Sequence, residues 1–448
     1  MLAVALFALP ARMEACTGIA LSSANGARVL ARTVEWAASP MQCGYAVVPR
    51  GYSQISFTPS GKDGLKFKAK YGYVGIYTDY QDFVVEGVNE SGLSAGLFFF
   101  PAFGEYTPYV AKRKSLALCD LQVVSWVLSQ FSSIDEIKSA IEKKEVDIIS
   151  IDSRIGTVHW RFAEPGGRVV VLEFTEGKAK FYENPLGVLT NSPNFPWHLT
   201  NLANYINLRS GSSQPLQLAK DLQVKPLGGG TGMLGLPGDF TPPSRFVRAA
   251  MLQSSAPLLP DAQQTALQAF HLLNSFDIPI GLQHAPGQAP DGLPSATQFT
   301  SATAITPPAG ASPVSASPAG ASPSAGVSPA SGASPSASTS PAAGASPSAS
   351  ASLAAGASPT ASASPAGIAS PASASSSASA SSAGASPSSA ASPASTLPAA
   401  GAYQIKFYYR TAWNSAIRCI NLNAINFATV QYHTAPLDKE HEQIHYCN

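Results

Sequence analysis

The sequence predicts an α+β protein in which two sheets are covered by helices. Three blocks of strand-like segments alternate along the chain with two helical blocks. Strands and helices grouped in this way favour separate layers over a βαβ winding. Without its low-complexity stretch the chain keeps roughly 350 residues, which is enough for one large domain with a well-buried interior.

The first block begins with the strongest hairpin signal of the chain. Asn25-Gly26 joins short apolar runs at residues 18–21 and 28–34, and further strands are expected at 45–49, 73–78 and 83–88. Apolar residues at helical spacing over 116–131 then predict one helix. Ser133 and Glu136 form a capping box that begins a second helix over 134–144.

The second half repeats this alternation. Strands are expected at 157–162, 169–174, 179–183 and 187–189, and helices at 197–208, 244–253 and 262–274. The last strands are expected at 298–305, 404–410 and 415–421. The first two of these would form an ordinary hairpin if the tract between them were removed.

That tract, residues 306–402, consists almost entirely of Ala, Ser, Pro, Gly and Thr, and no charged residue lies between Asp291 and Lys406. Such a composition cannot bury enough surface to offset chain entropy, so it predicts a disordered insertion with polyproline II character. Loop closure costs little extra for a long loop. O-glycosylation and a neutral expansion both remain open. One folded domain is expected, formed by residues 16–305 and 403–448.

The chain begins with a leader, residues 1–15, that contains the apolar run Leu2 to Pro10. The run is too short to span a bilayer and has no basic segment before it. A signal peptide or a truncated signal is favoured over a short propeptide, so a secreted or extracytoplasmic protein without a stable membrane anchor is expected. The net charge of +1 gives no general attraction to nucleic acid, so no nucleic-acid partner is expected.

Five cysteines are present, and none lies in a CxxC pair or a zinc-type spacing. Cys119, in an apolar helical run, and Cys419, in a strand-like run, are expected to be small buried hydrophobes. An odd count leaves at least one thiol outside any disulfide scheme, and Cys16 is the best candidate. His441 and His445 fit an HExxH zinc pattern, but only three residues follow it, so we interpret it as coincidence.

Cys16 is the candidate nucleophile because it follows a removable segment and precedes a strand. An N-terminal cysteine carries its own base, since an α-amine titrates near about 8 and can take the thiol proton. The hairpin brings Arg32 beside Cys16, where it would increase the thiolate fraction. Glu35 could accept from the α-amine. The alternative is a cysteine that merely lies near a processing site with charges at a strand end.

These residues belong to a wider pattern. Segments 16–18, 31–36, 88–93, 187–193, 197–205, 228–248, 408–414 and 436–439 occur in an order that resembles the choloylglycine hydrolase family, which holds bile salt hydrolases and penicillin V acylases. The resemblance spans nearly the whole chain apart from the leader and the Ala/Ser/Pro tract. Several long motifs in the right order make it specific.

The resemblance implies the four-layer αββα sandwich of N-terminal nucleophile hydrolases and a reaction without metal or cofactor. Cys16 would attack the amide carbonyl, and Arg32 would stabilise its thiolate. Glu35 stands where the family usually has Asp. Asn191 would donate its side-chain amide to the oxyanion, and Arg245 matches a second active-site arginine.

One family position departs from the pattern. A polar residue of the family falls here at Phe98 or Phe99, whose side chains cannot donate a hydrogen bond. Either a backbone N–H completes the oxyanion hole or activity is weaker. These aromatic residues would line an apolar acyl pocket, and the alternative is a buried strand.

The expected function is hydrolysis of linear amide C–N bonds in a small-molecule N-acyl amide substrate. Penicillin V, conjugated bile salts and N-acyl homoserine lactones are all candidate substrates, and the resemblance also implies a homo-oligomer. The alternative is a secreted Ser/Pro-rich wall or matrix glycoprotein with a catalytically weakened hydrolase domain.

Overall fold

The computed structural model describes residues 14–36, 41–152, 156–284, 287, 297–308, 403–412 and 416–437. The leader before residue 14, the predicted disordered insertion from residue 309 onward and the HExxH pattern near the C-terminus lie outside these residues.

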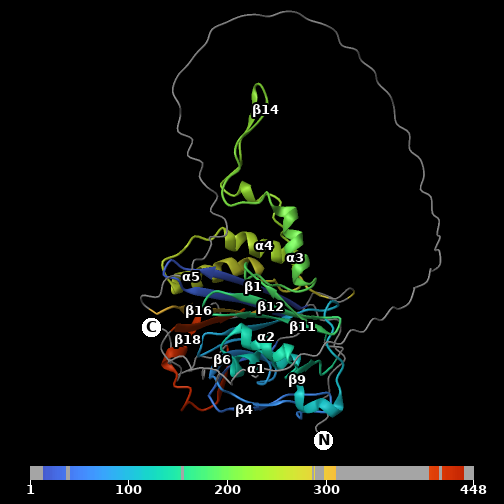
Figure 1. Cartoon of the computed structure of the whole chain (residues 1–448). Helices are drawn as coiled ribbons and strands as arrows, with labels where there is room; N and C mark the ends of the chain where they lie inside the picture. Colours follow the sequence, from blue (N-terminus) through green and yellow to red (C-terminus); the bar gives the residue numbers. More distant parts are fainter. Residues whose placement is uncertain are drawn as a thin grey trace, which may run out of the picture. The chain divides into compact units, whose positions relative to one another are not determined.

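Two antiparallel sheets form the centre of the domain (Figure 1). The five-stranded sheet contains, in spatial order, β1 (Glu14–Ser22), β2 (Arg28–Trp36), β16 (Thr297–Thr306), β17 (Gln404–Thr411) and β18 (Arg418–Asn421). The eight-stranded sheet contains β13 (Lys178–Glu183), β12 (Val169–Thr175), β11 (Val158–Ala163), β8 (Ser94–Phe99), β7 (Val84–Asn89), β6 (Tyr73–Thr78), β3 (Cys43–Val48) and β19 (His433–Pro436).

Helices cover the outer face of each sheet. On the five-stranded sheet lie α4 (Pro242–Ser254) and α5 (Ala262–Leu273), and on the eight-stranded sheet lie α1 (Val123–Gln130) and α2 (Ile134–Glu142). A further helix, α3 (Phe195–Asn201), packs against α4 and continues as a 3-10 turn, Leu202–Tyr205. This arrangement confirms the predicted αββα sandwich.

The core has two parts because both faces of the five-stranded sheet are buried. Between the sheets, Tyr409 packs against Tyr45 of the eight-stranded sheet, with ring centres 6.1 Å apart. Beneath α4 and α5, Ile19 and Ala31 pack with Phe246. Successive side chains of a strand point to opposite faces, so β1 and β2 contribute alternate residues to each part.

The strands on either side of the Ala/Ser/Pro tract pair with each other. β16 and β17 are antiparallel, and Thr306 lies opposite Gln404 at the end next to the tract. The pairing is the one expected for a hairpin interrupted at its tip. On its other edge β16 pairs with β2, so β16 and β17 extend the sheet that carries Cys16.

The helix predicted over 116–131 is shorter than expected. Its N-terminal half forms the strand β9 (Ala117–Cys119), which pairs in parallel with β10 (Asp147–Ile149), and α1 begins only at Val123. A short apolar run has the same hydrophobicity in a buried strand as in a buried helix, so periodicity alone does not separate them. Cys119 is buried as predicted, but in a strand.

The prediction for Cys419 is wrong, because this residue is disulfide-bonded and does not serve only as a small buried hydrophobic side chain. Cys16, Cys43 and Cys119 keep reduced thiols. The strand expected at 187–189 is a single bridge between Leu189 and Gly18.

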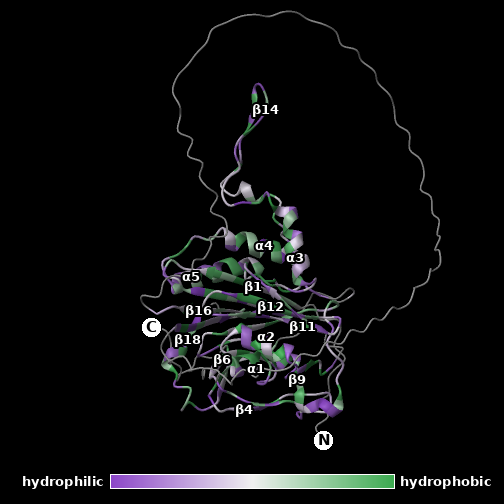
Figure 2. Ribbon diagram, in the orientation of Figure 1, coloured by the Kyte–Doolittle hydropathy of each residue, from purple (hydrophilic) through white to green (hydrophobic). Residues whose placement is uncertain are grey.

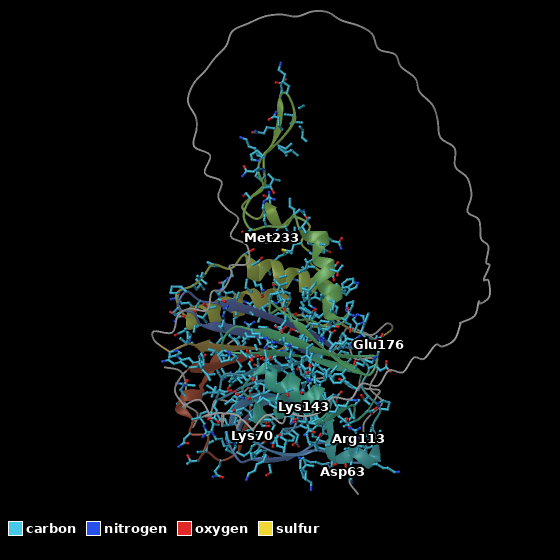
Figure 3. All side chains as sticks on the ribbon, viewed as in Figure 1. Asp63, Lys70, Arg113, Lys143, Glu176 and Met233 are labelled. Carbon is cyan, nitrogen blue, oxygen red and sulfur yellow. The ribbon has the colours of Figure 1, made fainter. Side chains whose placement is uncertain are left out.

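Between α3 and α4 the chain forms an arm, residues 206–235, that stands clear of the sheets in Figure 1. It contains the hairpin of β14 (Leu216–Ala219) and β15 (Leu222–Val224). Leu208 at its foot is buried, but most of its large apolar side chains are 46–95% exposed: Ile206, Leu216, Leu218, Leu222, Val224, Leu227 and Leu234. Figure 2 shows apolar residues along this hairpin, and Figure 3 shows their side chains, with Met233 near the foot of the arm.

The remaining regular elements are short: β4 (Ser53–Ile55), β5 (Lys66–Lys68) and the 3-10 turns Ala111–Leu116, Asp120–Gln122, Thr231–Met233, Asn274–Phe276 and Leu422–Ala424. Within the part of the chain that the structure describes, no helix has the length and apolar character needed to cross a membrane.

Candidate active site

Cys16 lies near the start of β1 and is 6% exposed. The turn at Gly26 has a φ of 81°, a value that glycine adopts without steric cost, and it folds β2 back along β1. In the resulting register Arg32 lies opposite Gly18, two residues from Cys16 and on the same face of the sheet. Glu35 lies opposite Ala15 and therefore on the other face, beneath the helices.

Arg32 is completely buried between the two sheets. Its Nη1 donates to the carbonyl oxygens of Val85 and Leu97, at 3.2 and 2.5 Å, and to Glu86 Oε2 at 3.3 Å. Among the described residues its Nη2 has no hydrogen-bond partner. One edge of the guanidinium is therefore fixed, and the other remains able to donate to an anion.

Phe98 lies between two buried arginines. The guanidinium carbon of Arg32 is 3.9 Å from the centre of its ring, and that of Arg161 is 5.5 Å away. A Cβ at Gly18 would come within 2.5 Å of Arg161 Nη1 and 2.9 Å of the Phe98 ring, so only glycine fits there. Phe98 is fully buried in β8, as the buried-strand alternative expects, whereas Phe99 is partly exposed.

Asn191 reaches Cys16 because the bridge between Leu189 and Gly18 places the following residues beside the start of β1. Its Oδ1 accepts the backbone N–H of Cys16 at 2.9 Å. Its Nδ2 donates to the carbonyl oxygen of Phe99 at 2.8 Å. An amide nitrogen carries two hydrogens, so a second donor remains for a developing oxyanion.

Arg245, in the first turns of α4, joins these groups together. Its Nη1 donates to the Cys16 carbonyl oxygen at 2.5 Å and to Thr17 Oγ1 at 2.8 Å, and its Nη2 donates to Asn191 Oδ1 at 2.6 Å. Its Nε donates to the carbonyl oxygen of Phe240 at 2.9 Å. Burial lowers the pKa of Arg245 to about 10, so it stays protonated at neutral pH.

Glu35 is 1% exposed, and neither carboxyl oxygen has a partner with hydrogen-bond geometry among the residues described. Burial raises its pKa to about 8, and the charge of Arg245 and the neighbouring Thr33 side chain oppose this shift. With the leader still attached, the carboxyl is therefore largely neutral at pH 7.

The structure thus brings together Cys16, Arg32, Glu35, Asn191 and Arg245 around one end of β1. It also adds residues that the sequence analysis missed: Glu86, Arg161, His159, Glu173 and His198, all buried. For all of these but His198, the available signal was a polar, titratable residue inside an apolar strand segment, namely 83–88, 157–162 or 169–174. No cluster of three His, Cys, Asp or Glu side chains able to hold a metal ion occurs among the described residues.

Two antiparallel sheets, each covered by helices, form the αββα fold of N-terminal nucleophile hydrolases. The model of linear amide C–N hydrolases, choloylglycine hydrolase family, matches residues 16–307. The chain belongs to this family of linear amide hydrolases.

Similar proteins agree with this assignment. A bile salt hydrolase/transferase of Clostridium perfringens is 33% identical over 293 residues, which cover 65% of this chain and 86% of the relative. One of Bifidobacterium longum subsp. longum is 30% identical over 64% of this chain and 87% of its own length.

Two solved structures share the fold. A variant of conjugated bile acid hydrolase from Clostridium perfringens has a TM-score of 0.62 at 23% identity and covers 96% of this chain and 100% of its own. Penicillin V acylase from Agrobacterium tumefaciens has a TM-score of 0.50 at 22% identity, over 65% of this chain and 82% of its own.

Proposed function

We propose that this protein hydrolyses the amide bond of a small N-acyl substrate through Cys16, freed as an N-terminal residue, with an acyl-thioester intermediate. The main support for the proposal is the set of hydrogen bonds around the Cys16 backbone nitrogen, the atom that would become the α-amine. It lies 2.9 Å from Asn191 Oδ1, and Arg245 bonds both that oxygen and the Cys16 carbonyl oxygen.

Each residue has a role in the proposed reaction. The α-amine of Cys16 takes the thiol proton, and the thiolate attacks the amide carbonyl while Arg32 stabilises the anion. Asn191 donates its second amide hydrogen to the oxyanion, a type of contact often worth about 3 kcal/mol in the transition state. The ammonium then protonates the leaving amine. Water attacks the thioester, returns a proton to the α-amine and releases the carboxylic acid.

The proposal requires removal of the leader. With the leader in place, β1 extends two residues beyond Cys16, and the Cys16 nitrogen is an amide that cannot accept a proton. Ala15 is 2% exposed and packs with Ile278 and Phe240. Cleavage before Cys16 would free an amine next to Glu35, whose carboxyl has no other hydrogen-bond partner among the described residues. Glu35 would then ionise and orient the ammonium.

Conjugated bile salts and penicillin V are the substrates to test first, because they match the names of similar proteins. N-acyl homoserine lactones follow as a third class. We also propose that the leader directs export and that the protein needs neither nucleic acid nor cofactor. The alternative of a glycoprotein with a weakened domain gains no support from these relatives.

The decisive experiment compares Cys16→Ser with Cys43→Ser. Cys43 is a matched control because its thiol is also reduced, while burial raises its pKa to about 12 and makes it unreactive. We expect Cys16→Ser to lose about 10³-fold or more in kcat on penicillin V or a conjugated bile salt, and Cys43→Ser to keep wild-type turnover. Equal turnover by wild type and Cys16→Ser would disprove the proposal.

Mass analysis of the purified active enzyme provides a second test. We expect the mature chain to begin at Cys16. Full activity with the leader still attached would exclude the α-amine as the base.

A further inference from the structure

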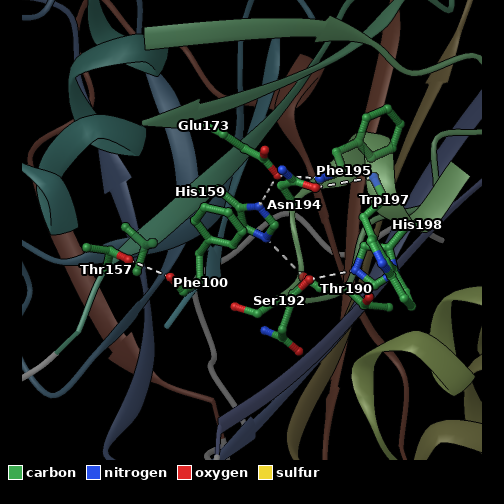
Figure 4. Close-up of polar contacts among 12 residues, drawn as sticks. Phe100, Thr157, His159, Glu173, Thr190, Ser192, Asn194, Phe195, Trp197 and His198 are labelled. Carbon is green, nitrogen blue, oxygen red and sulfur yellow. Dashed lines mark hydrogen bonds and ion pairs between the residues drawn. The ribbon is translucent and has the colours of Figure 1, made fainter. Parts of the chain in front are cut away.

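Two buried histidines, His159 and His198, contact the main chain at residues 190 and 191, and Figure 4 shows both imidazoles beside Thr190. His159, on β11, places Nε2 3.1 Å from the carbonyl oxygen of Thr190. His198, on α3, places Nε2 2.8 Å from the carbonyl oxygen of Asn191 itself. The two imidazoles come from different layers of the sandwich and meet at consecutive carbonyl groups.

His159 faces acceptors on both sides of its ring. Its Nδ1 lies 3.1 Å from Glu173 Oε1, which also accepts the backbone N–H of Phe195 at 2.8 Å. Both partners of the His159–Glu173 pair are completely buried. Because a carbonyl oxygen can only accept, Nε2 must carry the hydrogen that His159 donates to Thr190. The ring of Phe100 stacks on it, with centres 4.5 Å apart.

His198 is a neutral donor. Its Nε2 must carry the hydrogen given to the Asn191 carbonyl, and its Nδ1 has no hydrogen-bond partner within the described part of the chain. Burial lowers the pKa of His198 to about 4, in agreement with a neutral ring. Phe246 stacks on this imidazole with ring centres 4.6 Å apart.

The side chain of Asn191 is fixed separately, through Arg245 at its oxygen and Phe99 at its nitrogen. A side chain keeps its direction only if its own main chain is also held. The Thr190 hydroxyl adds a third restraint by donating to the carbonyl oxygen of Pro242, the first residue of α4, at 3.1 Å.

We propose that His159 and His198 are positioning residues for the reaction: they clamp the main chain at residues 190 and 191, so that the Asn191 amide points at the oxyanion. The inference rests on the proposed function, in which Asn191 stabilises that oxyanion. A misplacement of about 1 Å in such a group can cost about 100-fold in rate.

The sharpest test is His198→Phe, which keeps a planar ring to stack on Phe246 but removes the donor to Asn191. We expect kcat to fall by about 10- to 100-fold with little change in KM, because the contact acts on the transition state and not on ground-state binding. His198→Gln restores a nitrogen donor at a similar reach, and we expect it to recover most of the lost kcat. His271→Phe, an exposed histidine on α5, is the matched control.

A second pair of variants tests the other half of the clamp. His159→Gln keeps a donor for Thr190, whereas His159→Leu removes it, and we expect kcat to be lower for Leu than for Gln. Thermal unfolding and active-site titration of the acyl-enzyme give turnover per folded molecule, so that a purely structural role would lower Tm without lowering kcat.

A folded His198→Phe enzyme with kcat within about 2-fold of wild type would overturn the inference. A His198→Gln enzyme as slow as His198→Phe would also overturn it, because the donor would then not be the cause. If Cys16→Ser is inactive while His198→Phe is fully active, only the clamp is wrong. If Cys16→Ser is active, the proposed function fails, and this inference fails with it.

Discussion

The two faces of the β1–β2 hairpin each bury an arginine and a glutamate, but in different states. On the face between the sheets, Arg32 and Glu86 form a hydrogen-bonded ion pair at 3.3 Å. On the face beneath the helices, Arg245 influences Glu35 through its charge, yet no hydrogen bond reaches either Glu35 oxygen among the residues described.

The difference between the two faces is that one buried glutamate is ion-paired and the other is not. A buried charge is tolerated when it is paired and hydrogen-bonded, and is costly when it is not. Between the sheets Glu86 pairs with Nη1 of Arg32 and helps to hold that edge of the guanidinium in place. Beneath the helices the carboxyl avoids the cost by staying neutral. It can later pair with the ammonium that forms when the freed α-amine of Cys16 takes the thiol proton.

Breaking the inner pair gives the largest expected effect on stability. Arg32→Met leaves Glu86 buried with only Arg161 nearby, at 3.9 Å. We expect a loss of about 3 to 5 kcal/mol in the free energy of unfolding, measured in urea. The double variant with Glu86→Gln should regain much of this stability but not the activity. A single variant as stable as the double would show that the pair contributes little.

Because Glu35 is buried and unpaired beneath the helices, we expect the stability of the uncleaved protein to depend on pH. The Cys16→Ala variant is suitable for this measurement, since it should retain its leader. The pKa of Glu35 is raised from 4.5 to about 8, so its contribution is complete below about pH 4.5 and is lost as the pH rises toward 8. We expect the free energy of unfolding to fall by a few kcal/mol across this range.

Glu35→Gln is the control for that measurement, because an amide does not titrate. Its stability should change less between pH 5 and pH 8. Identical pH profiles for the two proteins would mean that Glu35 is already ionised before the leader is removed.

Phe98 also contributes to the face between the sheets, because its ring lies against the guanidinium groups of Arg32 and Arg161. Phe98→Leu removes these contacts together with some packing. Phe162→Leu, in the neighbouring strand β11, removes packing at an equally buried ring. We expect Phe98→Leu to cost about 1 kcal/mol more in unfolding free energy. Equal costs would show that the cation–π contacts contribute nothing measurable.

The smallest effect on activity is expected from the arm. If the protein forms the homo-oligomer that its family resemblance implies, the exposed leucines of β14 and β15 are the natural contact, because apolar surface favours burial. Leu218→Ser with Leu222→Ser should then reduce the mass measured by light scattering and leave kcat unchanged. Gln217→Ser with Gln223→Ser is the control on the same strands. A monomeric wild type would contradict the expectation.

Local sequence signals were enough to predict the hairpin of the candidate site and the family. Asn25-Gly26 predicted the hairpin that places Arg32 opposite Gly18, and Ser133 caps α2 by accepting from the Glu136 N–H. The order of motifs along the chain identified Asn191 and Arg245 through resemblance. These signals depend on residues close together in the chain, or on motifs that can be compared directly.

The contacts between buried groups from distant parts of the chain became visible only in the folded domain. Glu86 is 54 residues from Arg32 and belongs to the other sheet, and the imidazoles of His159 and His198 converge on Thr190 and Asn191 from two different layers. Likewise, residues 117–119 became a strand because β10 was there to pair with them. Sheet register and the stacking of layers set these contacts, and neither is written in the spacing of neighbouring residues.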